Sequence, residues 1–123
     1  MSINPSELFD LRVPKGIAQN PDRVKEFPLI LQFNITGEQG GTWTVDTLHE
    51  PAGCFKGGSE EAQCVITLSD ENLIELLSAE PINRPGVVMR FILEGTLEVD
   101  GDVGQAMKLS RVFSVADAAD LTR

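Results

Sequence analysis

The sequence predicts an α+β fold, in which a five-stranded, mostly antiparallel sheet is covered by helices on one face. Two observations lead to this class. Short stretches alternate apolar and polar residues between glycine-rich turns, whereas three other stretches carry apolar residues at helical spacing. At 123 residues the chain suits one core, so we predict a single domain over 1–123, with a helical or irregular arm over 1–19 and a tail over 114–123.

The first 28 residues contain four prolines: Pro5, Pro14, Pro21 and Pro28. Because proline resists a helix interior, we expect short helical pieces between them. The clearest piece is "NPDRVKEF", with Asn20 as its expected N-cap and Pro21 at the first helical position.

Strands are predicted next. In "LILQFNITG", residues at every second position, Phe33 and Ile35 among them, are apolar, and "TWTVDTL" presents Trp43 and Val45 together, so the two stretches predict a hairpin. Further strands around 54–55 and over 64–68 would extend it into an antiparallel meander, and "TLEVD" supplies a fifth. The opposite face of the sheet is polar and can stay wet; it carries Gln32, Asn34, Thr44, Asp46, Glu98 and Asp100.

Two helices are expected between the fourth and fifth strands. Ser69 is the predicted N-cap of the first, "SDENLIELLSAE", whose apolar stripe includes Leu73 and Leu77. The second, "GVVMRFILEG", has Arg90 as the one polar residue among seven and should end at Gly95. Such a helix is expected to be covered nearly all round, by protein or by a ligand.

The stretch "LEVDGDVGQAMKLSRVF" combines a strand, a glycine-flanked turn and an amphipathic helix, an order also found at phosphate-binding sites. It lacks the lysine and full glycine pattern of a phosphate loop. Asp102 also stands at the positive pole of the helix, where a phosphate would bind. We therefore interpret Asp102 as a cap. The tail "SVADAADLTR" can continue this helix or form a short separate one.

Charge and hydropathy exclude several classes of function. The formal net charge is −9 and the pI is near 4.4, and the basic residues are scattered, so nucleic-acid binding is not expected and membrane contact should be transient at most. We find no secretory signal and no apolar run of roughly 20 residues, and therefore expect a cytoplasmic protein.

The candidate chemical groups do not form a recognised catalytic pattern. His49 is the one histidine, and an exposed loop histidine fits its surroundings better than a general base. Cys64 alternates with apolar residues and suits an inert core position; in a reducing compartment Cys54 and Cys64 are expected as free thiols, a disulfide being the alternative. Metal-ligand spacing is absent, so we predict no metal, no cofactor and no enzyme activity.

The predicted helices carry more apolar surface than a small sheet can cover, and the exclusions above leave this surface unexplained. The helix "GVVMRFIL", the methionine of the last helix and the apolar strand face could enclose a lipid-sized cavity lined by adaptable side chains. They could equally form a filled core, and periodicity alone leaves both open.

Three blocks resemble the sterol carrier protein type two domain, the non-specific lipid-transfer family. They are "LQFNITGEQGGTWTVD", "VITLSDENLIELL" and "EGTLEVDGDVGQAMKL", and their order and gaps are similar to those of the family from about residue 20 to 113. The resemblance implies a five-stranded sheet under helices that enclose a hydrophobic tunnel. The tunnel would bind sterols, fatty acids, fatty acyl-CoA or other lipids without covalent chemistry. The residues that it implies as lipid-binding are Phe33, Ile35, Trp43, Val45, Leu73, Leu77, Val88, Met89, Ile92 and Met107.

The chain departs from the family in one strand. Where the family is rich in lysine, this chain has Thr96, Glu98 and Asp100, which predicts poor binding of an anionic CoA headgroup at that edge. The ending "LTR" lacks a peroxisomal signal. We thus expect a lipid-binding or lipid-transfer protein; the alternative is an accessory or protein-interaction domain with a filled tunnel, for example one that supports lipid or isoprenoid biosynthesis.

Overall fold

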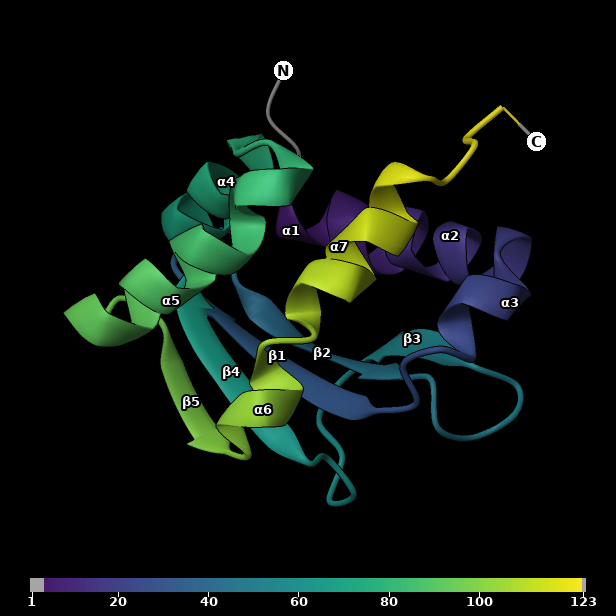
Figure 1. Cartoon of the computed structure of the whole chain (residues 1–123), viewed down its shortest axis with the longest axis horizontal. Coiled ribbons are helices and arrows are strands. Elements are labelled where there is room, and N and C mark those ends of the chain that lie inside the picture. The colour runs from purple at the N-terminus through teal and green to yellow at the C-terminus, as the bar shows by residue number, and fades with distance from the viewer. Residues whose placement is uncertain (1–3, 123) are drawn as a thin grey trace.

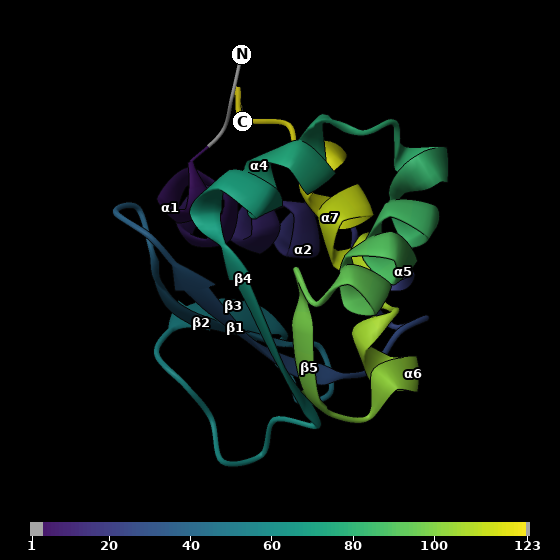
Figure 2. The ribbon, with the colours of Figure 1, turned by 90° about the vertical axis from the view of Figure 1, so that its left-hand side faces the viewer.

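A computed structural model describes residues 4–122 and contains one five-stranded sheet with the strand order β3-β2-β1-β4-β5. Helices lie over one face of it (Figures 1 and 2). The strands are β1 (Ile30–Thr36), β2 (Gly41–Asp46), β3 (Gly53–Lys56), β4 (Cys64–Ser69) and β5 (Glu98–Gly101). Neighbouring strands are antiparallel except β1 and β4, which are parallel. The predicted α+β class and the mostly antiparallel sheet are confirmed.

The alternation in the sequence sets the inner face of the sheet, the one under the helices. Phe33 pairs with Trp43 on one side and with Ile66 on the other, and all three are buried. Since side chains alternate along a strand, the neighbours two positions away join the same face, and Leu31, Ile35, Val45, Cys64 and Leu68 are also buried.

The predicted meander is wrong for one strand. β4 does not pair with β3; residues 57–63 carry the chain across the sheet, and β4 lies beside β1 on the far side. The burial of the two strands gives the reason. Cys64, Ile66 and Leu68 of β4 are buried, and a position beside the central strand β1 keeps these apolar side chains away from water. β3 has Phe55 and Lys56 exposed and is suited to the edge of the sheet.

The crossing segment covers part of the outer face of the sheet. The Ser59 amide donates to Gln32 Oε1 (3.1 Å), and the Thr44 hydroxyl donates to the Gly57 carbonyl (2.7 Å). The amide of Ile30 donates to Gln63 Oε1 (3.1 Å). Thr44 is consequently buried, and the expectation that this residue is exposed to solvent is wrong. The loop that covers Thr44 could not be predicted from the alternation of apolar and polar residues along the strand.

The helical layer contains seven α-helical segments among the described residues, and two helical turns of other pitch. They are α1 (Pro5–Glu7), η1 (Leu8–Arg12), α2 (Val13–Gln19), α3 (Pro21–Val24), α4 (Asp70–Ser78), η2 (Pro81–Asn83), α5 (Arg84–Glu94), α6 (Val103–Ala106) and α7 (Leu109–Asp117). Within 4–122, each helix is too short or too polar to cross a bilayer.

The N-terminal segment, residues 5–19, is more continuous than its prolines suggest. Pro14 lies in the first turn of α2, and η1, a π-helical turn, runs directly into that helix. The Val13 amide donates to the Leu8 carbonyl, five residues back, and the chain stays helical from Pro5 to Gln19 although Pro14 has no N–H to donate. α2 then packs closely on α7 at Gly16, where a Cβ would collide with the Val115 carbonyl oxygen.

Most predicted helix ends are confirmed. Ser69 Oγ accepts from the Asn72 amide (3.1 Å), and Asp102 Oδ1 accepts from the Gly104 amide (2.8 Å), so each caps its helix. Gly95 ends α5 in a left-handed conformation with φ of 76°. Asn20 is different: its side chain donates to the Gly16 carbonyl and closes α2 instead of capping α3.

The helix boundaries near the C-terminus differ from the predicted ones. The helix predicted after the "GDVG" turn is two helices, α6 and α7, which are joined at Met107 and Lys108. The predicted tail over 114–123 does begin as a continuation of this helix, because α7 extends to Asp117.

Candidate functional site

An aromatic cluster lies between the sheet and the helices. Phe9, from η1, stacks on Trp43 with ring centroids 5.0 Å apart and 19° between the planes, and it lies 5.0 Å from Phe33. Phe113, from α7, approaches Phe33 at 6.2 Å. All four side chains are buried, so the centre of the inner face is packed by aromatic rings from both ends of the chain.

Six of the ten predicted lipid-binding residues lie in this core: Phe33, Ile35, Trp43, Val45, Leu73 and Val88. Leu77, Ile92 and Met107 are partly buried and pack against it. Met89 is separate from the others, on the outer side of α5 with 41% exposure. At the core residues the expected tunnel is not seen, because protein side chains fill the space between sheet and helices.

Sequence reasoning missed the residues that fill that space from the N-terminal segment. Leu8, Phe9, Val13 and Ile17 are buried, although the sequence predicts only a helical or irregular arm there. A periodic pattern is present, since Phe9, Val13 and Ile17 are spaced by four residues, as on one face of a helix. Pro14 conceals it by indicating a break between them.

The chain itself does not cover the helix "GVVMRFIL" all round, so the part of the expectation that concerns cover by this protein's own residues is wrong. Val88 and Phe91 of α5 are buried, but Leu93 is 79% exposed, and nearby Ile82 is 85% exposed. α5 is the outermost helix of its side of the molecule (Figure 2). It therefore packs on one side and leaves an apolar strip on the other.

A cleft of about 600 Å³ lies at the edge strand β5; it extends over the outer face of β5, β4 and β1 and reaches around the edge to α5. Its apolar lining includes Val65, Ile92, Leu97 and Val99. Leu97 belongs to the core, while Ile92 and Val99 pack against it, so this cleft borders the apolar interior. Asn34, Thr67, Glu98 and Asp100 line its part on the outer face of the sheet, because they alternate with residues of the inner face.

Polar contacts fasten the N-terminal segment to the sheet. The Trp43 indole Nε1 donates to Asp10 Oδ1 at 2.8 Å, and the Lys56 ammonium lies 5.6 Å from the Trp43 ring centroid. Arg12, in the same π-helical turn as Asp10, has a buried Nε with no hydrogen-bond partner. The turn is thus held by packing and by the contact of Asp10 with the indole.

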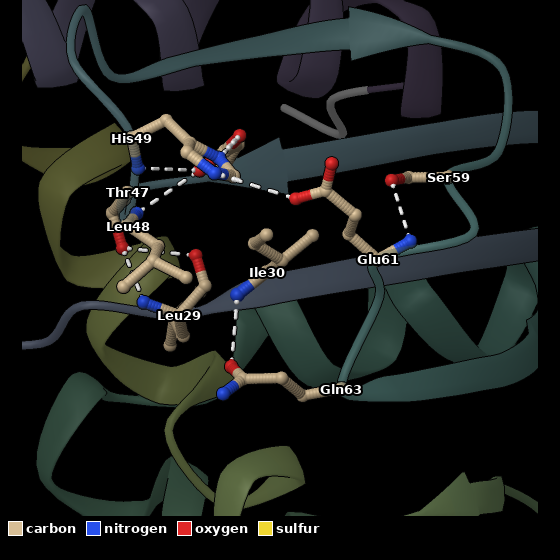
Figure 3. Close-up of polar contacts among 9 residues, drawn as sticks. Leu29, Ile30, Thr47, Leu48, His49, Ser59, Glu61 and Gln63 are labelled. Carbon is tan, nitrogen blue, oxygen red and sulfur yellow. Dashed lines mark hydrogen bonds and ion pairs between the residues drawn. The ribbon is translucent and has the colours of Figure 1, made fainter.

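His49 lies in a polar cluster at the opposite end of β2 (Figure 3). Its Nδ1 is 2.8 Å from Asp46 Oδ2, and its Nε2 is 3.3 Å from Glu61 Oε2. The hydrogen bond to Asp46 raises the pKa of His49, and the charges of Asp46 and Glu61 act in the same direction. Burial opposes ionisation of Asp46, but hydrogen bonds from His49 and Leu48 outweigh it and lower the pKa of that carboxyl.

This arrangement supports a structural role for His49. The imidazole side chain is 54% exposed, and both ring nitrogens face carboxylates rather than a serine or cysteine nucleophile. It borders a second cleft, of about 350 Å³, lined mainly by apolar residues that include Ile17, Val24 and Ala52. The histidine thus joins two loops at the end of the sheet.

The two cysteines are free thiols. Cys54 pairs with Val45, Val45 with Leu31, and Leu31 with Cys64, so the cysteines lie in one row across four strands. Strands are about 4.8 Å apart, which separates the two by about 14 Å, and a disulfide needs Cα atoms within about 7 Å. Burial raises the pKa of Cys54 to about 12 and that of Cys64 to about 11, so both thiols are inert at neutral pH.

Clusters of three or more histidine, cysteine, aspartate or glutamate side chains suited to a metal ion are absent from the part of the chain that the structure describes.

Solved structures share this fold. Sterol Carrier Protein 2 from Yarrowia lipolytica, in its apo form, is 23% identical and gives a TM-score of 0.70 over 89% of each chain. Sterol Carrier Protein-2 from Aedes aegypti, in complex with the C16 fatty acid palmitate, is 17% identical, with a TM-score of 0.54 over 85% of this chain and 96% of that one. The ubiquinone synthesis protein UbiJ-SCP2 is 15% identical, with a TM-score of 0.60 over 91% and 87%.

Curated relatives are longer proteins. Hydroxysteroid dehydrogenase-like protein 2 of Xenopus laevis is 30% identical over 100 residues, which are 80% of this chain and 23% of that protein. Sterol carrier protein 2 of Rattus norvegicus is 29% identical over 101 residues, 80% of this chain and 18% of that protein. Residues 11–114 match the sequence profile of the SCP-2 sterol transfer family. With this match, and with the five strands, their order and the helical cover already described, the chain belongs to the SCP-2 sterol transfer family.

Proposed function

We propose that this protein binds a lipid without covalent chemistry, between the inner face of the sheet and the helices, and carries it between membranes or enzymes. The observation that carries the proposal is the continuous apolar surface on both sides of that layer, in a chain of the SCP-2 sterol transfer family. Removing apolar area from water stabilises such a complex by about 0.8 kcal/mol for each buried methylene, so a medium-length acyl chain suffices for useful affinity.

The proposed lining comprises the ten residues implied by the resemblance except Met89, which lies on the outer side of α5; Leu77, Ile92 and Met107 form its partly buried margin. The part of the cleft beside α5 is the proposed entrance, because there it borders the core at Leu97, with Ile92 and Val99 packed against that core. Glu98 and Asp100 lie on the outer face of the same edge strand and would repel a phosphorylated headgroup that projects from this entrance. We therefore expect palmitate, an aliphatic alcohol or another lipid with a small headgroup to bind better than palmitoyl-CoA.

Displacement of a fluorescent fatty acid by these lipids, together with native mass spectrometry of the purified protein, tests the proposal. The expected results are one bound lipid for each chain and weaker displacement by palmitoyl-CoA than by palmitate. Glu98→Lys combined with Asp100→Lys should reduce that difference, and Glu38→Lys combined with Glu60→Lys is the matched control on exposed loops. No displacement and no bound mass would overturn lipid binding.

The second candidate is an accessory or protein-interaction domain, supporting lipid or isoprenoid biosynthesis. The filled interior favours it, and the fold shared with the ubiquinone synthesis protein UbiJ-SCP2 is consistent with it. A negative lipid assay together with a defined biosynthetic enzyme that binds the purified chain, in a titration at known concentrations, would favour this function over the first.

A further inference from the structure

The Phe9 ring and the lipid of the proposed function compete for the same apolar space. Phe9 is fully buried and lies 5.0 Å from both Phe33 and Trp43, two residues of the proposed lining. Leu8 and Val13, from the same segment, are buried as well. A lipid cannot reach the centre of the inner face while this segment keeps its position, because close-packed interiors leave no room for a second occupant.

The segment that carries Phe9 contains features typical of a movable element. η1 is a π-helical turn, a form that is rare and concentrated at functional sites. It also holds the Arg12 Nε, a buried nitrogen without a partner, which disfavours the closed position. If the π-turn became an ordinary α-helical turn, the register would change by one residue, which turns a side chain by about 100° around the helix axis.

We infer that Phe9 occupies the lipid site in the ligand-free protein, and that a single unbranched acyl chain binds by displacing it, through a change of the η1 turn from π-helix to α-helix. This inference rests on the proposed function and names the ligand class and the residue that selects it. Asp10 holds the closed position through its hydrogen bond with Trp43.

The size of the displaced side chain sets the ligand class. A cavity of about 150 Å³ is enough for a benzene-sized group, and the Phe9 ring fills a space of that order. Pockets for rigid drug-sized ligands need about 300 Å³ or more. A narrow, flexible acyl chain can place a few of its methylenes in a space of this size, whereas the rigid four-ring system of a sterol cannot enter it in part. Phe9 thus selects an acyl chain over a sterol.

Trp43 reports the event directly, since it is the single tryptophan of the chain and its indole N–H is bonded to Asp10. In a ¹⁵N–¹H spectrum of the full chain, addition of palmitate should move the one indole resonance upfield as that hydrogen bond is lost. Amide exchange over residues 5–13 should become faster at the same time. An indole resonance and exchange rates that stay unchanged while palmitate binds would overturn the inference and leave lipid binding intact.

Variants test the two roles separately. Phe9→Ala should bind palmitate about tenfold more tightly and should gain binding of a fluorescent sterol that the natural sequence binds poorly. Phe27→Ala, a buried phenylalanine outside the cluster, is the matched control and should change neither. If the natural sequence binds the sterol as tightly as palmitate, or if Phe9→Ala alters neither affinity, the inference is wrong.

Asp10→Ala removes the bond to Trp43 and leaves the packing in place, so it remains informative where Phe9→Ala does not fold. Loss of one such hydrogen bond favours the open state, and the apparent affinity for palmitate should rise about fivefold. Asp22→Ala makes the same charge change on exposed α3 and should have no effect. Equal affinities for Asp10→Ala and the natural sequence would contradict the role of Asp10, whereas absence of binding in every variant would contradict the proposed function itself.

Discussion

Arg84 is a cation at a position that is 3% exposed, at the N-terminus of α5, where the helix dipole disfavours positive charge. Its Nη1 donates to Asp117 Oδ2 at 2.5 Å, and its Nη2 donates to the Leu77 carbonyl at 3.1 Å. The guanidinium therefore joins α4, α5 and α7. The Arg84 Nε is buried and has no hydrogen-bond partner. The bonds to Asp117 and Leu77 therefore have to offset the cost of burying a cation whose donors are not all satisfied.

Asp117→Ala should destabilise the protein by about 1–3 kcal/mol, because it leaves the buried Arg84 without its counter-ion while Asp117 itself is half exposed. Glu75→Ala is the matched control. It removes a carboxylate from the exposed pair with Arg90 and should cost about 0–0.5 kcal/mol. Urea unfolding followed by circular dichroism compares the two; equal losses would contradict the difference in burial.

The pairing of His49 with Asp46 should make stability depend on pH in two ranges. His49 has a raised folded pKa, so its contribution is complete below the ordinary value of 6.5 and is lost as the pH rises through the folded value. Asp46 has a lowered folded pKa, so its contribution is complete above 3.8 and is lost as the pH falls through the folded value.

Histidine titration by NMR should find the pKa of His49 above 6.5, and Asp46→Asn should lower it toward that value. Glu26→Gln, on an exposed loop away from the cluster, should not. A His49 pKa at or below 6.5 in the natural sequence would refute the pairing.

α5 shows how a helix with apolar residues all round can still lie at the surface. The sequence predicts well where this helix ends, because Gly95 specifies local backbone geometry. The exposure of the α5 side chains depends on segments that are distant in the sequence, because α4 and β5 determine which side of the helix is covered. Local pattern therefore predicts that α5 exists, and it fails to predict that Leu93 is exposed.

The glycines at the two ends of α5 should respond to alanine with opposite signs. Gly95→Ala should destabilise the protein by about 1–2 kcal/mol, because φ of 76° strains a residue with a Cβ. Gly86→Ala, in the first turn with open space around its Cβ, should stabilise it by about 0.5–1 kcal/mol. Thermal unfolding of both variants checks this, and a stabilised Gly95→Ala would contradict the left-handed cap.

At the scale of the whole molecule, the sequence predicts the inner face of the sheet and much of the proposed lining. Phe33, Ile35, Trp43 and Val45 could be assigned to that face because strand alternation is a local property. The strand order, the burial of Thr44 and the insertion of Phe9 could not. Each depends on a segment that returns from a distant part of the chain, and nothing in the period of a strand reveals such a return.

The net charge of −9 should weaken contact with anionic membranes. In co-sedimentation at about 0.15 M salt, where charges are screened beyond about 8 Å, binding to vesicles with phosphatidylserine should be weaker than binding to vesicles of phosphatidylcholine alone. Adding salt should reduce the difference. Stronger binding to the anionic vesicles would reveal a basic face that the scattered lysines and arginines do not predict.

The parallel pairing of β1 with β4 has a consequence for the order of assembly. β1, β2 and β3 are joined by short connections, so this half of the sheet can form while the rest of the chain is still unfolded. β4 reaches β1 only when the chain has passed β3 and crossed the outer face, and closing that longer loop is slower. We therefore expect folding to be limited by the arrival of β4, with Phe33 exposed on one side until then.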